Sequence, residues 1–296
     1  MKRLNPYLTG GITPDWIDYL LAFQAAGADA VEIGLPFSDP MLDGATIQQA
    51  SDQALRLGAS VASILTDLAA ARSRICIPLI AMTYANLVFR GDPFTTGPAT
   101  ATGPEADPEA GSGPEAGRSL GAGSGPEAFC RRLAEAGITG LIVPDVPVDE
   151  ADRLEAAATA AGIDLVLLAA PVTPPDRLAE IGRRSRGFIY AVSVMDTTGE
   201  RDALATTAAP LAARLKAVTD LPVLLGFGIS TPAQAATAAR AGDGVVIGAA
   251  LMRRVLDGAT PDDLRAEVAA FRAALDQVDQ EVPAATAHAE ISGHRR

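Results

Sequence analysis

Three carboxylates, Glu32, Asp39 and Asp43, lie close together in a stretch that begins as a strand and ends as a loop. In segment 30–34, Ala-Val-Glu-Ile-Gly, the two-residue period of a strand places the valine and isoleucine on one face and Glu32 on the other. Only small residues flank Glu32 on its face, so we expect its carboxylate to point into a confined space. A confined carboxylate at a strand's end, followed by two more, indicates general acid–base catalysis.

The residue types elsewhere in the chain narrow this chemistry. Both histidines, His288 and His294, lie in the polar C-terminal segment, so a Ser/His/Asp triad or a histidine-built zinc site in the core is not available. We therefore expect catalysis by carboxylates, hydroxyl groups and backbone. For Glu32 a second interpretation stays open, a buried acid paired with a cation from a distant part of the chain.

Glycine-rich turns follow two hydrophobic segments late in the chain. Segments 226–230, Gly-Phe-Gly-Ile-Ser, and 248–250, Gly-Ala-Ala, each lead into a helical stretch. Glycines let the backbone approach an anion, and helix N-termini offer free N–H groups, so the pair predicts a phosphate site, with tight turns that bind no ligand as the alternative. Segment 196–200 is either a loop that closes over a ligand or an ordinary turn, and Tyr190 either fills the core or contacts a ligand.

Short hydrophobic segments alternate with helical patterns along the chain. The eight segments expected to be strands are 4–8, 30–34, 78–83, 140–143, 164–169, 188–193, 222–226 and 244–247. The expected helices are 13–26 with Pro14 at the first helical position, 46–57, 61–72, 126–136, 149–161, 176–183, 203–217, 231–241, 250–256 and 261–278. Gly27, Gly137, Gly162 and Gly242 stand where C-terminal helix caps are expected.

This alternation predicts an α/β protein whose residues 1–278 form a single (β/α)8 TIM barrel. An open sheet of five or six strands with a helical annex is the alternative. In a barrel, catalytic residues belong on the loops that follow the strands. The residues that fall there are Glu32, Asp43, Tyr84, Asn86 and Asp145, together with the glycine-rich turns.

Two segments are predicted to lie outside the folded domain. Residues 95–126 are rich in Gly, Pro and Ala and repeat Gly-Pro-Glu-Ala, which predicts a disordered insertion after the third strand. A partner-binding linker is the alternative. The final repeat differs, because Pro126 can start the helix that follows. Residues 279–296 are predicted to be a disordered tail.

Composition excludes several classes of protein. The 296 residues carry a net charge of −12 and no basic run, which argues against nucleic acid as a partner. Cys76 and Cys130 have neither metal-ligand spacing nor a disulfide pattern, so we expect both to be reduced and buried. The chain has no long apolar run and no secretory h-region, which predicts a soluble cytoplasmic protein without a membrane segment.

The stretch that holds the three acids resembles a known signature. Segment 31–40, Val-Glu-Ile-Gly-Leu-Pro-Phe-Ser-Asp-Pro, followed by Asp43-Gly44 and Thr46-Ile47-Gln48, is similar to that of the tryptophan synthase alpha chain family. Further segments resemble family motifs in the family's order: Tyr84-Ala85-Asn86, Pro144-Asp145-Val146-Pro147, Thr198-Gly199 and Gly226-Phe227-Gly228-Ile229-Ser230. The resemblance covers nearly the whole chain apart from the insertion and the tail.

The resemblance implies a carbon–carbon lyase of tryptophan biosynthesis. Its reaction would be the retro-aldol cleavage of indole-3-glycerol phosphate to indole and glyceraldehyde 3-phosphate, with no cofactor or metal. Glu32 would move the protons at indole C3 and at the side-chain hydroxyl, and Asp43 would accept a hydrogen bond from the indole N–H. By the same resemblance, Tyr7, Tyr84, Tyr190 and Phe227 would line the indole pocket, and Gly199, Gly228, Gly248 and Ala249 would bind the phosphate.

The implied partner is a tryptophan synthase beta chain in an αββα-type complex, with Asp39, Asn86 and Thr198 as candidates for the loop or partner interface. Two alternatives stay open. One is a standalone indole-3-glycerol phosphate lyase that releases indole. The other is a weakly active regulatory partner of a beta chain, which is motivated by Asp196 in the loop after the sixth strand and by Ala249, where the family often has serine.

Overall fold

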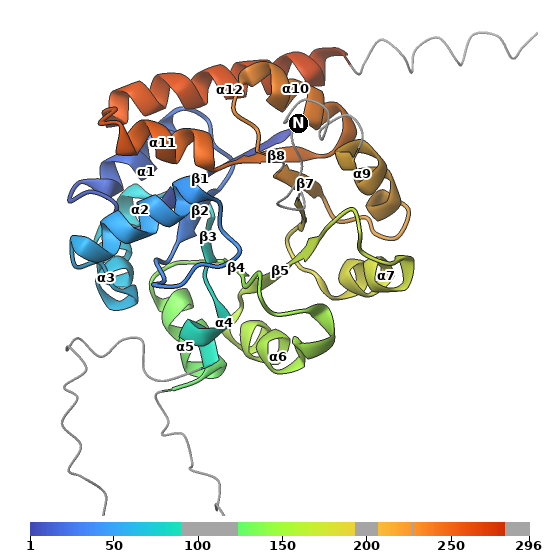
Figure 1. Ribbon diagram of the computed structural model, residues 1–296, viewed down its shortest axis with the longest axis horizontal. Coiled ribbons are helices and arrows are strands. Elements are labelled where there is room, and N and C mark those ends of the chain that lie inside the picture. The colour runs from blue at the N-terminus through green and yellow to red at the C-terminus, as the bar shows by residue number, and fades with distance from the viewer. Residues whose placement is uncertain (90–123, 193–206, 227, 282–296) are drawn as a thin grey trace, which may run out of the picture.

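Eight parallel strands close into a barrel in the computed structural model, which describes residues 1–89, 124–192, 207–226 and 228–281 (Figure 1). The strands pair in chain order, and β8 pairs with β1. They are β1 (Arg3–Thr9), β2 (Val31–Gly34), β3 (Leu79–Met82), β4 (Gly140–Ile142), β5 (Asp164–Ala169), β6 (Ile189–Val192), β7 (Val223–Gly226) and β8 (Gly244–Ile247). The predicted TIM barrel is confirmed, and the open-sheet alternative is wrong.

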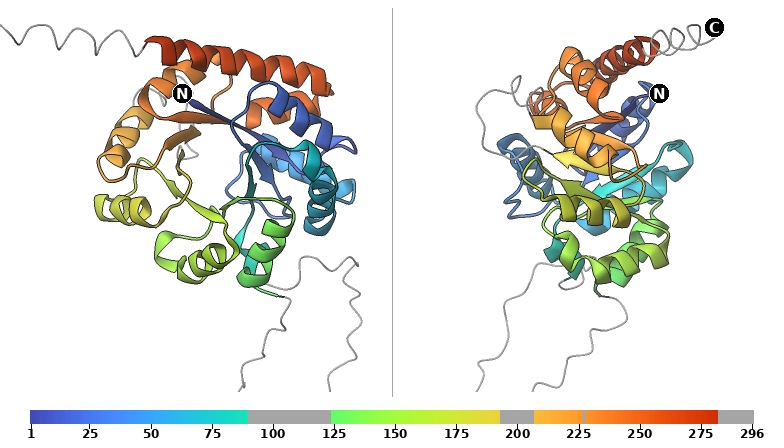
Figure 2. Two further views of the ribbon diagram at one scale, coloured as in Figure 1. Left: turned by 180° about the vertical axis from the view of Figure 1, so that it is seen from behind. Right: turned by 90° about the vertical axis from the view of Figure 1, so that its right-hand side faces the viewer.

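Helices surround the barrel on all sides (Figure 2). They are α1 (Trp16–Ala25), α2 (Ala45–Arg56), α3 (Val61–Ala71), α4 (Ala85–Phe89), α5 (Pro126–Glu135), α6 (Asp152–Ala161), α7 (Pro175–Arg184), α9 (Ala209–Lys216), α10 (Pro232–Ala241), α11 (Ala249–Leu256) and α12 (Pro261–Glu281). Two short 3-10 helices, η1 (Arg72–Arg74) and η2 (Val148–Glu150), complete the described elements. The short α4 directly after β3 was not predicted.

Most strand residues are buried on both faces, as expected when a barrel is wrapped by helices, and one face of β6 is half-buried. One layer of apolar side chains fills the barrel interior: Ala30, Ile80, Ile142, Val166, Phe188, Leu224 and Val246. A larger cluster packs the outer faces of the strands against the helices. Side chains along each strand point alternately into the barrel and outward to the helices. A polar residue at an inward-pointing position therefore has its side chain inside the barrel.

Two predicted helix ends differ from the structure. Helix α1 begins at Trp16 with Asp15 as its N-cap, so Pro14 precedes the helix and does not occupy its first position. Helix α12 continues to Glu281, three residues or nearly one turn beyond the predicted helix end at residue 278. Contacts from distant parts of the chain stabilise this turn: the Lys2 N–H donates to Asp279 at 2.8 Å, and Arg240 pairs with Glu281 at 3.0 Å.

The predicted insertion ends earlier than expected. Gly125 has a φ of 90° and is the N-cap of α5, and Pro126 is the buried first residue of that helix, so both belong to the barrel. Other predictions lie outside the described residues. They concern the insertion from 95 to 123, the tail from 282, the histidines, segment 196–200 and Phe227.

All four predicted glycines stand at helix C-termini. Gly27, Gly137 and Gly162 have φ values of 90°, 85° and 71°, in the left-handed region that favours glycine. Gly242 is the C-cap of α10 in a different conformation, with a φ of −111°. A Cβ at Gly242 would lie 2.8 Å from the Val223 carbonyl oxygen, so glycine is needed there for close approach of two backbone segments.

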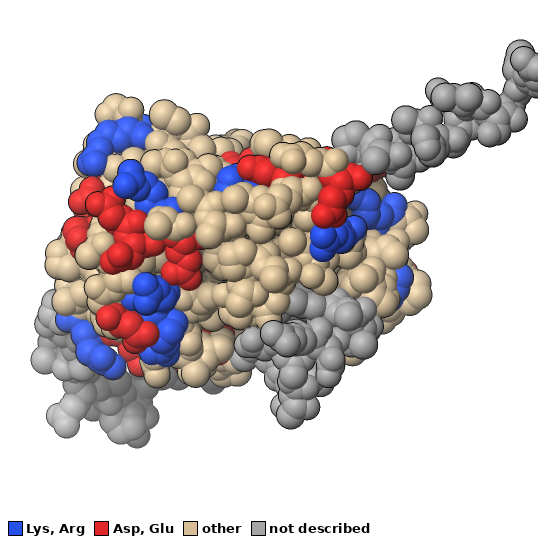
Figure 3. Space-filling model, turned by 90° about the horizontal axis from the view of Figure 1, so that it is seen from above, with Lys and Arg blue, Asp and Glu red and all other residues tan. Residues whose placement is uncertain are grey.

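Charges of both signs mix on the surface formed by α10, α11 and α12 (Figure 3). Ion pairs such as Arg254–Glu267 at 3.2 Å and Arg265–Asp262 at 3.2 Å cover this face, and Figure 3 shows no large basic patch on it. A surface of mixed charge does not offer the continuous positive charge that would bind the phosphate backbone of a nucleic acid.

Both cysteines are free, but only Cys130 is buried. The prediction that Cys76 is buried is wrong, because Cys76 lies in the exposed connection between η1 and β3. In the described parts of the chain, no single helix is long and apolar enough to cross a membrane. One pair, Ala45–Arg56 and Val61–Arg74, passes by length and composition, although it is bent by 87°.

Candidate active site

Glu32 is the central carboxylate of the site. It lies on β2 between Tyr7 of β1 and Ile80 of β3 in the strand register, and only 1% of its surface is exposed. Its Oε2 atom is buried without a hydrogen-bond partner, and no cation among the described residues pairs with it. The alternative of a structural ion pair is therefore wrong for this part of the chain. Burial, and secondly the charge of Asp43, raise the pKa of Glu32 to about 8.

Asp43 is the second carboxylate, and it lies on the loop between β2 and α2. Its N–H donates to the Pro40 carbonyl at 3.1 Å, and Gln48 donates from Nε2 to the Asp43 carbonyl at 2.8 Å. The backbone of Asp43 is therefore held by hydrogen bonds on its N–H and on its carbonyl group. Burial raises the pKa of the Asp43 carboxyl to about 6, although a hydrogen bond from the Tyr84 hydroxyl opposes this rise. The two acids therefore titrate in separate pH ranges.

Tyr84 connects this loop to the end of β3. Its hydroxyl oxygen accepts a hydrogen bond from the Leu42 N–H at 3.2 Å while the hydroxyl bonds to Asp43. Its ring stacks on Phe37, with 5.4 Å between ring centroids and 29° between planes. Burial, followed by the charge of Asp43, raises the pKa of Tyr84, so the hydroxyl keeps its proton. Asp43 is thus positioned by the strand next to the one that carries Glu32.

Two tyrosines lie over glycines on neighbouring strands. A Cβ at Gly34 would overlap the Tyr7 hydroxyl oxygen and lie 2.5 Å from Tyr7 Cζ. A Cβ at Gly226 would lie 2.7 Å from the Tyr190 hydroxyl oxygen. Tyr7 is buried, and Thr9 donates to its hydroxyl at 3.3 Å, while Tyr190 is partly buried. The glycines therefore make the space that both aromatic rings occupy beside Glu32.

We expect Gly34→Ala to destabilise the chain, because the new methyl group must displace the packed Tyr7 ring. Overpacking of this kind typically costs about 1–3 kcal/mol of unfolding free energy. Urea unfolding measures the effect, and Gly44→Ala on the following loop is the matched control, since a Cβ at Gly44 meets nothing within 4 Å. In the double variant Tyr7→Ala/Gly34→Ala the costs should fall short of their sum. Strictly additive costs would contradict the proposed clash.

The raised pKa of Glu32 predicts a pH dependence of stability. The folded chain keeps the Glu32 proton up to about pH 8, whereas an unfolded glutamic acid loses it near its ordinary pKa of 4.5. Stability contributed by Glu32 therefore falls as pH rises between these values, by about 1.4 kcal/mol per pKa unit at most. Because Glu32→Gln lacks this proton, urea unfolding from about pH 5 to about pH 8 should show the variant gaining stability relative to the wild type. A difference that does not change with pH would refute this reasoning.

The two glycine-rich turns lie side by side at the same end of the barrel, because β7 pairs with β8. Gly228 has a φ of 66°, and a Cβ there would meet nothing within 4 Å, so glycine is required by the backbone and not by packing. Gly248 is the N-cap of α11, and Ala249 is its exposed first residue. Gly199 and Thr198, two other candidates of the sequence analysis, lie outside the described residues.

The remaining candidates lie at the rim. Asp39 and Asn86 are exposed, Asp39 on the β2–α2 loop and Asn86 in α4. Asp145 caps α4, because the Ala85 N–H donates to both of its carboxylate oxygens at 2.9 and 3.2 Å. The sequence analysis missed Thr83, which is 1% exposed and has an unpartnered Oγ1. Its position at the end of β3, directly before Tyr84, was the available signal.

The closed barrel, with one carboxylate of raised pKa inside β2 and a second on the loop that follows it, defines the class of (β/α)8-barrel enzymes. The model of the family described as tryptophan synthase alpha chain matches residues 2–97 and 122–283. The chain belongs to this family. The match leaves out residues 98–121, which lie inside the predicted insertion.

Individual relatives agree with the family match. The tryptophan synthase alpha chain of Gloeobacter violaceus is 37% identical over 282 residues, which cover 94% of this chain and 90% of the relative. That of Prochlorococcus marinus is 39% identical over 256 residues, or 85% and 81% of the two chains. Among solved structures, tryptophan synthase of Mycobacterium tuberculosis aligns at 34% identity with a TM-score of 0.74, and covers 93% of this chain and 92% of that one. The alpha subunit from Legionella pneumophila aligns at 28% with a TM-score of 0.73, and covers 93% of both chains.

Proposed function

We propose that this chain cleaves indole-3-glycerol phosphate to indole and glyceraldehyde 3-phosphate, the reaction of its family in tryptophan biosynthesis. The observation that carries the proposal is the environment of Glu32. A carboxylate buried in the barrel without a cation and with a pKa of about 8 is protonated at neutral pH. It can therefore donate a proton to carbon and then, as a carboxylate, accept one.

Glu32 performs both proton transfers of the cleavage. Protonated Glu32 donates its proton to C3 of the indole ring, which places positive charge on the ring nitrogen. The Glu32 carboxylate then takes the proton of the hydroxyl group next to the breaking bond. The electron pair of the carbon–carbon bond returns to the ring, an aldehyde leaves as glyceraldehyde 3-phosphate, and Glu32 is protonated again.

Asp43 is proposed to stabilise the positive charge at the ring nitrogen. Its pKa of about 6 keeps the carboxyl group ionised at neutral pH, in contrast to Glu32. An anion fixed by the Tyr84 hydroxyl accepts the indole N–H and becomes a stronger partner as charge develops on the ring. Two carboxyl groups with separated pKa values can thus perform the two roles in one site.

Substrate binding is assigned to the aromatic residues and the glycine turns. We propose that Tyr7, Tyr84, Tyr190 and Phe227 line the indole pocket, and that Gly199, Gly228, Gly248 and Ala249 bind the phosphate. Support comes from the position of Tyr7 and Tyr190 beside Glu32 and from the pairing of β7 with β8. Ala249 can offer its backbone N–H at the start of α11, but not a hydroxyl group.

A tryptophan synthase beta chain is the proposed partner, and the cytoplasm the proposed location. The β2–α2 loop supports this partner, because Met41 and Leu42 are 76% and 49% exposed, large values for apolar side chains. Asp39 lies on the same loop and Asn86 at the start of the neighbouring α4, and both are proposed, with Thr198, as interface residues. We further propose that residues 95–123 are an insertion into a single barrel domain.

Indole release by the purified chain, with and without the beta chain of a close relative, tests the proposal. We expect slow release from indole-3-glycerol phosphate by the chain alone and faster release with the beta chain. Rapid release that the beta chain does not change would instead indicate a standalone lyase. No release under either condition would overturn the enzymatic function and favour a regulatory role.

A further inference from the structure

A cavity of about 540 Å3 lies at the end of the barrel opposite the carboxylates. Its lining includes Arg3, Gly140 and Asp164, which are the first residues of β1, β4 and β5. It therefore opens at the N-terminal ends of the strands. Asn5 and Ala30, which also line it, lie two residues before Tyr7 and Glu32, so the cavity is distinct from the proposed active site.

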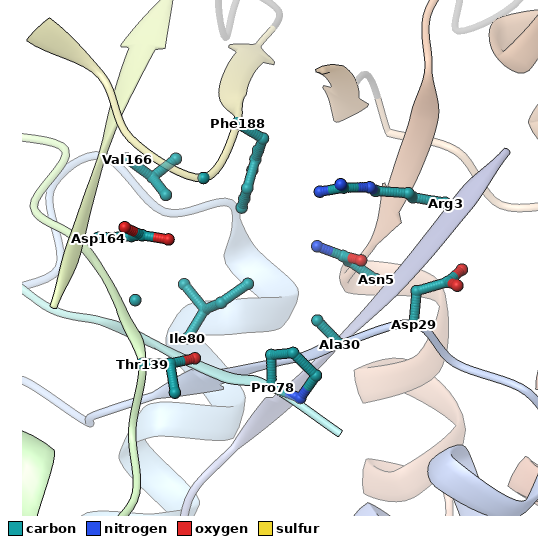
Figure 4. A pocket seen from close by; sticks show the side chains of 12 residues that line it. Arg3, Asn5, Asp29, Ala30, Pro78, Ile80, Thr139, Asp164, Val166 and Phe188 are labelled. Atoms are coloured by element: carbon teal, nitrogen blue, oxygen red, sulfur yellow. The ribbon is translucent and has the colours of Figure 1, made fainter. Parts of the chain in front are cut away.

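One wall of this cavity carries nitrogen donors. Figure 4 shows the Arg3 guanidinium and the amide nitrogen of Asn5 side by side, both directed into the cavity. Asn5 is only 3% exposed, and its Oδ1, an acceptor, is buried without a hydrogen-bond partner. Arg3 forms no ion pair with any described residue. The guanidinium and the amide N–H groups can donate to an anion, whereas Asn5 Oδ1 can bond only to a donor.

The opposite wall carries an acid. Asp164 begins β5, which lies across the eight-stranded barrel from β1, and its carboxylate faces the cavity (Figure 4). No cation in the described part of the chain pairs with Asp164. Asp29, the other acid in the lining, is already neutralised, because Arg272 lies 3.1 Å from its Oδ2 and the Leu4 N–H donates to the same oxygen at 2.8 Å.

The floor between these walls is apolar. Ile80, Val166 and Phe188 belong to the buried layer of the barrel interior and also line the cavity. A volume of this size is typical of small-molecule sites, which combine apolar surfaces with a few fixed polar groups.

We propose that this cavity binds a small zwitterion in which an apolar body separates a carboxylate from an ammonium group. The carboxylate accepts hydrogen bonds from the Arg3 guanidinium and the Asn5 Nδ2 group, the ammonium group pairs with Asp164, and the apolar body contacts Ile80, Val166 and Phe188. The site does not depend on the reaction proposed for the other end of the barrel.

Isothermal titration calorimetry of the full chain with three matched probes tests the site. The probe 6-aminohexanoate has both charged groups, hexanoate lacks the ammonium group, and hexylamine lacks the carboxylate. We expect saturable binding of 6-aminohexanoate and roughly tenfold weaker binding of the other two, as the loss of a charge-assisted hydrogen bond requires. Binding should be unchanged in Glu32→Gln, which alters only the proposed active site.

Two variants connect each charge of the probe to one wall. Arg3→Met should weaken the binding of 6-aminohexanoate about tenfold, so that it binds no more tightly than hexylamine. Asp164→Asn should make 6-aminohexanoate bind no more tightly than hexanoate. Arg56→Met, a change of an exposed arginine on α2, is the control and should leave binding unchanged. Circular dichroism checks that each variant is folded. The proposal would be overturned if the folded wild type showed no saturable binding, or if Arg3→Met and Asp164→Asn bound 6-aminohexanoate as tightly as the wild type.

Discussion

Glu32→Gln is expected to lower the rate of indole release by roughly 100- to 10,000-fold, the range that general acid–base catalysis contributes. Glutamine has nearly the shape of glutamic acid but cannot exchange a proton with indole C3 or with the hydroxyl group. The single-turnover rate of indole release from indole-3-glycerol phosphate measures the loss. Glu135→Gln is the control, because Glu135 is an exposed residue at the end of α5.

The stability of the Glu32→Gln variant shows whether a lost rate comes from lost chemistry or from a lost structure. Because Glu32 has no cation partner, replacing its carboxyl group by an amide removes a buried acid without leaving an unpaired charge behind. The variant should therefore unfold at the same or a higher urea concentration than the wild type at neutral pH. A folded Glu32→Gln variant with a wild-type rate would refute the role of Glu32.

Asp43→Asn is expected to lower kcat by roughly 100-fold, comparable with the removal of one preorganised group that stabilises transition-state charge. Asparagine can still accept from the indole N–H but carries no charge to balance the ring cation, so KM should change less than kcat. Steady-state indole release measures both constants. Asp52→Asn is the control, since Asp52 is exposed on α2 and pairs only with Arg56 among the described residues.

The pH profile of the same variant provides an independent outcome. In the wild type, kcat/KM should rise as Asp43 ionises near pH 6 and fall as Glu32 loses its proton near pH 8. Because the acids interact, the profile reports the apparent pKa values of the pair. Asp43→Asn should lose the rise on the acidic side and keep the fall. An unchanged acidic limb would contradict the assignment of Asp43.

The sequence predicted the barrel well because its strands are short apolar runs between polar or glycine residues. The bounds of β5 and β8 agree with the predicted segments 164–169 and 244–247. Alternation within β2 correctly predicted that Glu32 points inward, a local property of an extended chain. Such features require no knowledge of distant contacts.

Features that depend on distant contacts could not be predicted. The last turn of α12 is held by Lys2 and Arg240, which a helical pattern does not include. Nothing in the local sequence relates Tyr7 to Gly34 or predicts that Tyr84 holds Asp43. The cavity at the N-terminal end joins Asn5 to Asp164 only through closure of the barrel.

The tyrosine–glycine pairs couple two positions of the proposed indole pocket during evolution. A larger residue at Gly34 or Gly226 meets the ring of Tyr7 or Tyr190, and a smaller residue in place of either ring leaves a cavity above the glycine. Each change alone therefore passes through a destabilised intermediate, whichever comes first. Because the new side chain can occupy the space that the ring leaves, the two changes are favoured together over either change alone.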